Sequence, residues 1–232
     1  MAIHAAFDLL ASLTSFVLTL LVYRWRLQGA LQRVEQAGFG YVAALLIGAA
    51  VGGYGFGTLN LWLSGTPHVA RSIVGALAGS IVAIEFFKWL RGITGSTGII
   101  FVPAFAVTVV VGRWGCFLSG LADETHGTVT TLPWGVDLGD GVMRHPVQLY
   151  ESFAMLGFLL VAVLLISKRN PWFMANGFYA LVAFYAAQRF VWEFLKPYGS
   201  VLGPFNLFHL VCLALLAYAW VMMGRRHERD IT

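Results

Sequence analysis

Ionisable side chains interrupt the long apolar runs of this sequence, and they are its best candidates for chemistry. Arg189 and Glu193 lie four residues apart in one such run, and Arg113 ends another. An ionisable side chain at membrane depth costs at least about 2.5–3.5 kcal/mol, so each needs a structural or functional reason. Residues four apart share one helix face. The Arg189–Glu193 pair is therefore either an internal ion pair that holds a helix bundle, or an arginine that faces a substrate anion and is oriented by the glutamate.

Two further charged residues, Arg144 and Glu151, are expected at the same end of the bundle as Arg113 and Arg189. A guanidinium group offers a planar fork of hydrogen-bond donors and does not lose its charge. Three of them around one site suit a phosphate group. This set of residues therefore predicts an anion site that suits a phosphate group.

Two histidines, His126 and His145, lie in the polar segment 121–146. Imidazole can act as a general base near neutral pH, although interfacial histidines are more often ordinary polar loop residues. A metal site would need further ligands at suitable spacing, and no such cluster of His, Cys and Asp is visible in the sequence. We therefore expect neither a metal nor a cofactor. A phosphate-binding P-loop, a Gly-x-Gly-x-x-Gly motif and a serine nucleophile elbow are also absent.

The composition indicates what kind of protein positions these side chains. Of the 232 residues, 59% are hydrophobic and 11% are charged, against about 45–50% and about 25% in an average soluble domain. These values exclude a soluble globular, disordered or coiled-coil protein and indicate a polytopic membrane protein. The formal net charge is +4, but the basic residues lie between apolar runs, as orientation signals do, so no nucleic-acid partner is expected.

Seven apolar segments are long enough to form membrane helices of about 20 residues. They lie near residues 6–23, 38–62, 70–89, 98–119, 147–167, 172–195 and 203–223. Lys and Arg favour cytoplasmic loops, and the connections on the two sides carry ten and three of these residues. We therefore expect an all-α protein with a single seven-helix domain over residues 1–232, its N-terminus outside and its C-terminus in the cytoplasm. The long connection 121–146 is then an external and functional loop.

Glycines form a second pattern in the second and third expected helices. Three pairs have the small-xxx-small spacing: Gly48 and Gly52, Gly53 and Gly57, and Gly75 and Gly79. Such spacing is typical of closely packed membrane helices. The alternative is that Gly75 and Gly79 also let a lipid head group approach the backbone.

Six short motifs follow one another from the third to the sixth expected helix. They are Gly75-Ala76-Leu77-Ala78-Gly79, Gly112-Arg113-Trp114-Gly115-Cys116-Phe117-Leu118-Ser119-Gly120, Glu124-Thr125-His126-Gly127, Leu132-Pro133-Trp134-Gly135, Arg144-His145-Pro146-x-Gln148-Leu149-Tyr150-Glu151, and Arg189-Phe190-Val191-Trp192-Glu193-Phe194. In this order they resemble the motifs of the bacterial prolipoprotein diacylglyceryl transferase family. The resemblance implies a multi-pass protein of the bacterial inner membrane with seven helices and an external N-terminus.

The resemblance also implies a reaction and its partners. The family joins the diacylglyceryl group of phosphatidylglycerol to the lipobox cysteine of a prolipoprotein, and glycerol phosphate leaves. The residues that would take part in catalysis are Arg113, Arg189, Glu193, Glu124, His126 and His145. Those that would bind substrate are Arg144, Gln148, Tyr150, Glu151, Gly75, Gly79, Gly127, Cys116 and Ser119. Arg113 and Arg189 would hold the departing phosphate, and the general base would be His126, His145 or Glu124.

This sequence departs from the family pattern at several motif positions. Val74 stands where the family has a histidine, Cys116 and Ser119 stand where it has asparagines, and about three extra residues precede Glu124. The acceptor is therefore either the lipobox cysteine or another nucleophile. Cys116 could itself be an acceptor or nucleophile, or a small apolar residue at a packed site. The alternative function is a phospholipid-binding or lipid-transporting protein without catalysis.

Overall fold

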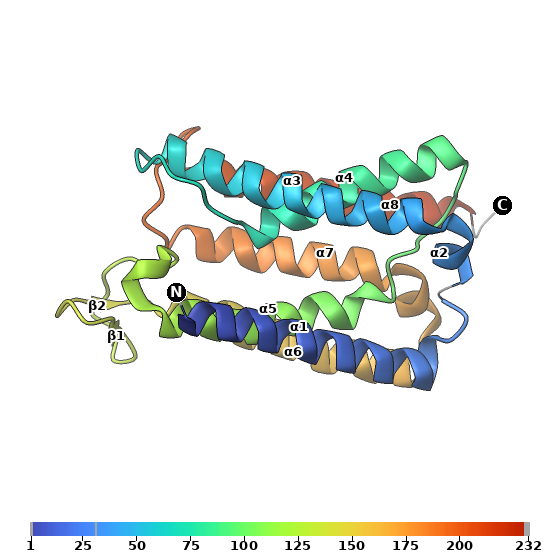
Figure 1. The fold of residues 1–232 in the computed structure, drawn as a ribbon, viewed down its shortest axis with the longest axis horizontal. Coiled ribbons are helices and arrows are strands. Elements are labelled where there is room, and N and C mark those ends of the chain that lie inside the picture. Colours follow the sequence, from blue (N-terminus) through green and yellow to red (C-terminus); the bar gives the residue numbers. More distant parts are fainter. Residues whose placement is uncertain (1, 31, 230–232) are drawn as a thin grey trace. The chain divides into compact units, whose positions relative to one another are not determined.

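A computed structural model describes residues 2–30 and 32–229 of the chain. Its long helices are α1 (Ala2–Val22), α3 (Phe39–Leu63), α4 (Ile73–Arg91), α5 (Phe101–Leu118), α6 (Val147–Ser167), α7 (Pro171–Glu193) and α8 (Leu207–Arg229). The short elements are a π-helical turn (Tyr23–Leu27), α2 (Gln32–Ala37), a 3₁₀ turn (Gly120–Asp123) and the strands β1 (Val136–Asp137) and β2 (Met143–Arg144). Each predicted membrane segment coincides with a long helix (Figure 1), so the all-α class is confirmed.

The chain forms two compact units. The first combines Met1–Gln28 with Gly98–Pro197, and the second combines Gly29–Thr97 with Tyr198–Thr232. The first unit contains α1, α5, α6, α7 and both strands, whereas the second contains α2, α3, α4 and α8. The single seven-helix domain over residues 1–232 stays a prediction.

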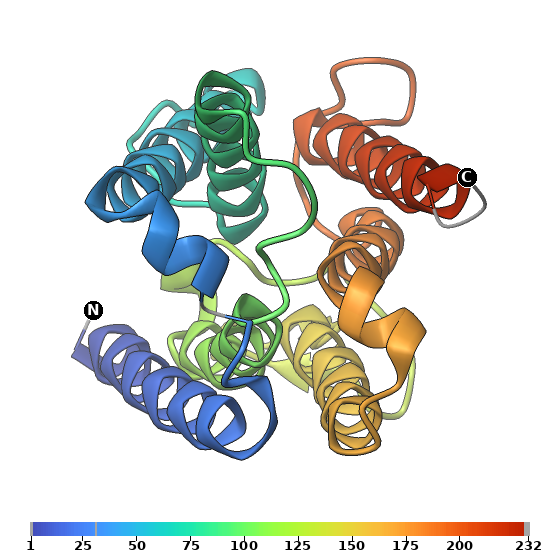
Figure 2. The same cartoon turned by 90° about the vertical axis from the view of Figure 1, so that its right-hand side faces the viewer.

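In the first unit, α5 lies between α1 and α6, and α7 packs beside α6 (Figures 1 and 2). A Cβ added to Gly115 of α5 would lie 2.6 Å from the Cβ of Phe7, so only glycine lets α1 approach α5 this closely. At the start of α7, the side chain of Asn170 accepts a hydrogen bond from the backbone N–H of Phe173 at 2.9 Å, a common N-cap that is followed here by Pro171. The start of α6 and the ends of α5 and α7 meet at one end of this unit.

In the second unit, α3 packs along α4 through the predicted glycine pattern. A Cβ added to Gly52 would lie 2.7 Å from the Cα of Gly79, and one added to Gly75 would lie 2.8 Å from the Cβ of Phe56. The backbones of the two helices are therefore in contact, as small-xxx-small spacing predicts. Because α3 covers Gly75 and Gly79, the geometry favours the packing interpretation of these residues over contact with a lipid head group.

Six of the described helices are long and apolar enough to cross a membrane, namely α1, α3, α4, α5, α6 and α8. This supports a polytopic membrane protein. The 23-residue helix α7 is not among the six, because the polar side chains Asn176, Gln188, Arg189 and Glu193 reduce its mean hydropathy. The seventh span and the orientation of the two termini stay predictions.

The segment 121–146 contains no long helix, as its composition predicts. It forms a small antiparallel hairpin in which Val136 pairs with Arg144 and Asp137 pairs with Met143. The backbone N–H of Thr128 donates to the carbonyl of Leu195 at 2.7 Å, so the segment is attached to the chain just after α7. The hairpin thus lies at the end of the first unit where α5 ends and α6 begins (Figure 1).

Candidate functional site

Glu151, in the first turn and a half of α6, is the centre of a buried group of charges. Its side chain is 0% exposed. Oε2 lies 2.6 Å from Nε of Arg113, while Oε1 lies 2.7 Å from Nη1 of Arg189 and 2.8 Å from Nζ of Lys196. One carboxylate therefore contacts three cations, which come from α5, from α7 and from the segment after α7.

Arg189 also contacts Glu193, whose Oε2 lies 2.9 Å from Nε of Arg189. The five side chains form what we call the buried charge cluster: Arg113, Glu151, Arg189, Glu193 and Lys196. The most exposed of them, Arg113, is only 7% exposed. Three cations and two carboxylates leave one net positive charge where water screens charges poorly. Burial lowers the pKa of Lys196 to about 8, since desolvation penalises its charged form.

Two predictions about this cluster can be compared with its geometry. The contact between Arg189 and Glu193 agrees with their four-residue spacing. Glu151, which was expected to bind substrate at the same end of the bundle, lies at the buried centre of the cluster. Lys196 was not predicted to belong to the site, although its position three residues after Glu193 would have placed it near the same face of a continued helix.

Arg144 does not join the cluster. Its Nη1 and Nη2 atoms contact Oδ1 and Oδ2 of Asp140 at 2.6 and 2.8 Å, within the loop of the hairpin. This hydrogen-bonded pair holds the pKa of Asp140 below its usual range and raises that of Arg144. The expectation of three guanidinium groups around one site is therefore wrong for Arg144, because a local carboxylate four residues earlier provides its partner.

The residues around the start of α6 connect the hairpin segment to the cluster. Gln148 is 1% exposed, and its Nε2 donates to Oγ1 of Thr125 at 3.4 Å. Oη of Tyr150 accepts a hydrogen bond from Nε1 of Trp134 at 2.8 Å and lies 3.4 Å from Nδ1 of His145. The segment that carries the candidate bases therefore touches α6 within one turn of Glu151.

Of the candidate bases, His126 has the most unusual environment. Burial, together with the positive charge of Arg144, lowers the pKa of His126. Its Nδ1 is buried and has no hydrogen-bond partner among the described residues. Next to it, a Cβ on Gly127 would lie 2.8 Å from the Cβ of His145, so glycine is needed for this close approach. Glu124 adopts a left-handed backbone conformation with φ of 55°.

Cys116 and Ser119 lie at the end of α5. Ser119 follows the last helical residue, and its hydroxyl is buried without a hydrogen-bond partner in the described part of the chain. Nη1 of Arg113 donates to Sγ of Cys116 at 3.9 Å. The thiol therefore contacts the buried charge cluster.

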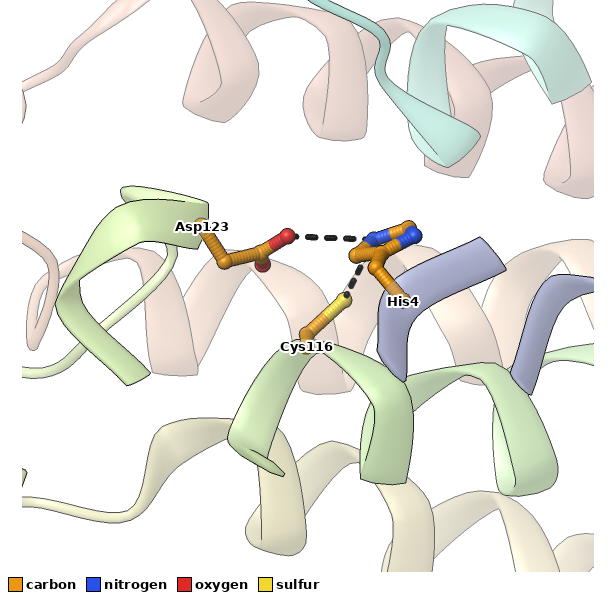
Figure 3. A group of neighbouring side chains, drawn as sticks. All are labelled: His4, Cys116 and Asp123. Carbon is orange, nitrogen blue, oxygen red and sulfur yellow. Dashed lines mark hydrogen bonds and ion pairs between the residues drawn. The ribbon is translucent and has the colours of Figure 1, made fainter. Parts of the chain in front are cut away.

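Cys116 also meets two residues that were not predicted to belong to a site. Sγ of Cys116 lies 3.7 Å from Nε2 of His4, and the same nitrogen lies 3.0 Å from Oδ1 of Asp123 (Figure 3). The three ligand-type atoms lie within 4.8 Å of one another. His, Cys and Asp side chains therefore gather at ligand spacing in the folded chain, although the sequence shows no such cluster, and the expectation of no metal stays a prediction. Cys116 and Asp123 lie 112 and 119 positions after His4 in the chain, so no local spacing could have revealed the group.

A sequence model described as prolipoprotein diacylglyceryl transferase matches residues 9–225. The chain belongs to the prolipoprotein diacylglyceryl transferase family. Three similar proteins each carry the name phosphatidylglycerol–prolipoprotein diacylglyceryl transferase. That of Clostridioides difficile (strain 630) is 32% identical over 168 residues, which are 69% of this chain and 64% of that protein. That of Nitratidesulfovibrio vulgaris (strain DP4) is 30% identical over 195 residues, 79% of this chain and 68% of the relative.

The third, from Campylobacter lari (strain RM2100), is 38% identical over 115 residues, 50% of this chain and 40% of the relative. The chain therefore spans about two thirds or less of the length of these family members. The family match includes α5, α6, α7 and the segment after α7, and hence every residue of the buried charge cluster.

Proposed function

We propose that this protein transfers the diacylglyceryl group of phosphatidylglycerol, or of a similar glycerophospholipid, to the cysteine thiol of a prolipoprotein. The observation that carries the proposal is the buried charge cluster, which holds one net positive charge in a chain of this family. The names of the similar proteins supply the donor and the acceptor class.

In this reaction, the acceptor sulfur attacks a glycerol carbon and glycerol phosphate leaves. The departing phosphate gains negative charge, and fixed cations in a poorly solvated site stabilise that charge strongly. Arg113 and Arg189 would supply the donors. Glu151 would keep both guanidinium groups in place, since it contacts Nε of the first and Nη1 of the second.

The acceptor thiol must also lose its proton. A free thiol has a pKa of about 8.5, so a neutral base helps at neutral pH. Among His126, His145 and Glu124, His126 fits this role best, because its lowered pKa keeps the imidazole neutral and its buried Nδ1 can accept a proton. His145 and Glu124 would then shape the site.

The proposed orientation places the cluster end of the first unit at the external face. The N-terminus would lie outside and the C-terminus in the cytoplasm, with α7 as the seventh span of one domain in the bacterial inner membrane. The bias of basic residues supports this arrangement. The segment 121–146 would then face the side on which prolipoproteins present their cysteine.

A second candidate function is phospholipid binding or transport without chemistry. One observation favours it. Val74 occupies the position of the family's motif histidine, and this apolar side chain is 0% exposed in α4, so it can neither accept a proton nor bind a head group.

The experiment that separates the two functions is incubation of the purified chain with labelled phosphatidylglycerol and a lipobox peptide, followed by mass analysis. We expect the peptide to gain one diacylglyceryl group, and a matched peptide with serine in place of the cysteine to gain none. Lipid binding without any modified peptide would support the second function and contradict the first.

A further inference from the structure

We propose that His4, Cys116 and Asp123 form a zinc site with one open coordination position. Imidazole nitrogen, thiolate sulfur and carboxylate oxygen are the three ligand types that zinc prefers in proteins. The tetrahedral bond lengths of zinc put such donor atoms about 3.3–3.7 Å apart. Here the nitrogen lies 3.0 Å from the oxygen and 3.7 Å from the sulfur, and all three atoms lie within 4.8 Å of one another, so side-chain rotations would suffice to place a zinc ion between them.

The outer contacts of the three residues also fit a metal site. Nδ1 of His4, which faces away from the other two residues, lies 3.1 Å from Oδ2 of Asp8. Oδ2 of Asp123 accepts a hydrogen bond from Oγ1 of Thr125 at 2.6 Å. Metal-binding histidines and carboxylates are usually held by such second partners, which orient the free ligand atom. Nε2 and Oδ1 are therefore the atoms left to converge beside Sγ of Cys116 (Figure 3).

A Cys–His–Asp catalytic triad explains this geometry less well. In a triad, the two imidazole nitrogens face opposite partners, the nucleophile and the acid. Asp8 alone would satisfy that requirement. Asp123 instead shares the Nε2 side of His4 with the sulfur, which a triad does not need and a metal site does.

Close packing holds the ligands together, although they come from distant parts of the chain. Cys116 lies in the last turn of α5, Asp123 ends the 3₁₀ turn that follows, and His4 lies in the first turn of α1. Gly115 lets α1 approach α5 beside the ligand Cys116, since a Cβ at Gly115 would lie only 2.6 Å from Phe7. The approach of α1 to α5 therefore sets the distance between imidazole and thiol.

The open coordination position could bind the acceptor thiol, a role that rests on the proposed function. Zinc binds a thiol as the thiolate, so an acceptor cysteine bound there would give up its proton, which the proposed base His126 would take. Its sulfur would then bond to the glycerol carbon, and the carbon–oxygen bond would break with both electrons leaving on glycerol phosphate. Nothing is oxidised or reduced. The 3.9 Å contact between Arg113 and Cys116 places this step beside the cations proposed to hold the phosphate.

The metal site can be tested without any lipid or peptide. The full chain, purified in detergent with a histidine-free tag, is analysed for metal content and titrated with zinc. We expect one zinc per chain, and at least ten-fold weaker binding in Cys116→Ser and Asp123→Asn. Cys212→Ser is the matched control, because Cys212 is the other buried cysteine of the chain, and it should bind zinc as the native chain does. A native chain that neither contains nor binds zinc would overturn the proposal.

Cobalt gives a second readout that folding defects alone would not imitate. After bound metal has been removed with a chelator, Co²⁺ added to the native chain or to Cys212→Ser should produce a sulfur-to-cobalt charge-transfer absorption. Cys116→Ser should lose it while keeping its unfolding temperature. The same absorption in Cys116→Ser would mean that the metal binds elsewhere and would overturn the assignment.

The role of the site is tested separately. If chelation abolishes transfer to the lipobox peptide and zinc restores it, thiol activation is supported. Bound zinc with transfer unaffected by chelation keeps the site but overturns that role. Bound zinc in a chain that transfers nothing under any condition would contradict the proposed function and leave the metal site standing.

Discussion

Two arginine–carboxylate contacts in the first unit have the same length but differ in burial and in the number of charges that share the carboxylate. Arg113 lies 2.6 Å from Glu151 in the buried charge cluster, and Arg144 lies 2.6 Å from Asp140 in the hairpin. The first pair is buried and shares its carboxylate with two other cations. The second is a local pair on an exposed loop.

The difference shows that contact distance alone says little about what an ion pair does. An exposed pair is screened by water and contributes little to stability. A buried charge depends on its partner, because removing one member leaves the other uncompensated in a poorly solvated interior. Sharing also matters: the Arg144–Asp140 pair is neutral, whereas the cluster keeps one net positive charge that can act on an anion.

The largest expected effect is on stability, from Glu151→Gln. This change removes the carboxylate that contacts three cations, and breaking a buried pair typically costs about 3–5 kcal/mol. Thermal unfolding in detergent should show a large decrease or no folded protein. The matched change Asp140→Asn should leave the unfolding temperature nearly unchanged. Equal effects of the two changes would contradict the contrast drawn here.

The next largest effect is on transfer, from Arg113→Lys and Arg189→Lys. Each variant keeps a positive charge but loses the two-pronged donor, and loss of one positioned donor typically reduces the rate about 10²–10³-fold. Labelled peptide product per minute is the measurement. Arg144→Lys, whose arginine lies outside the cluster, should retain most of the activity. Native rates in both cluster variants would remove the assignment of a phosphate-holding role.

A smaller effect, seen only as pH changes, is expected from Lys196→Met. The lowered pKa of Lys196, about 8, means that the lysine is charged below that pH and neutral above it. The cluster therefore loses its net positive charge as pH rises through about 8. Titration of the acceptor thiol affects both proteins alike, so the measurement is the ratio of native to variant kcat/KM. This ratio should fall above pH 8, and a constant ratio would exclude Lys196 as the source of that charge.

The smallest effect is expected from Arg144→Gln, through its neighbour His126. The positive charge of Arg144 lowers the pKa of His126, so its removal should raise that pKa. A general base works in its neutral form, so activity should begin to fall at a higher pH on the acid side. In a profile of activity against pH, His126→Gln should show no such decrease on the acid side, the acid limb of the profile. An acid limb that persists in His126→Gln would exclude His126 as the base.

The sequence predicted those features that depend on residues close together along the chain. The long helices follow from apolar runs of about 20 residues, and the pairing of Arg189 with Glu193 follows from the helical repeat. The glycine contact between α3 and α4 follows from small-xxx-small spacing. In each case, the residues that interact are near one another in the chain or repeat along one helix face.

Features that depend on tertiary contact could not be predicted in this way. The central position of Glu151 was not predicted, because nothing in its own segment shows that cations from α5, from α7 and from the segment after α7 surround it. Arg144 was assigned to the anion site because its charge suited it, whereas Asp140 is close enough to pair with it first. His4 meets Cys116 and Asp123 only because α1 packs against α5.

The charges of α7 also have a consequence for the assembly of the protein in the membrane. Arg189 and Glu193, together with Asn176 and Gln188, give α7 less apolar character than the six described helices that are apolar enough to cross a membrane. Glu151 of α6, which contacts Arg189, emerges from the ribosome earlier. We therefore expect α6 to wait at the insertion machinery until α7 arrives, and the two helices to enter the lipid as a pair whose charges are already matched.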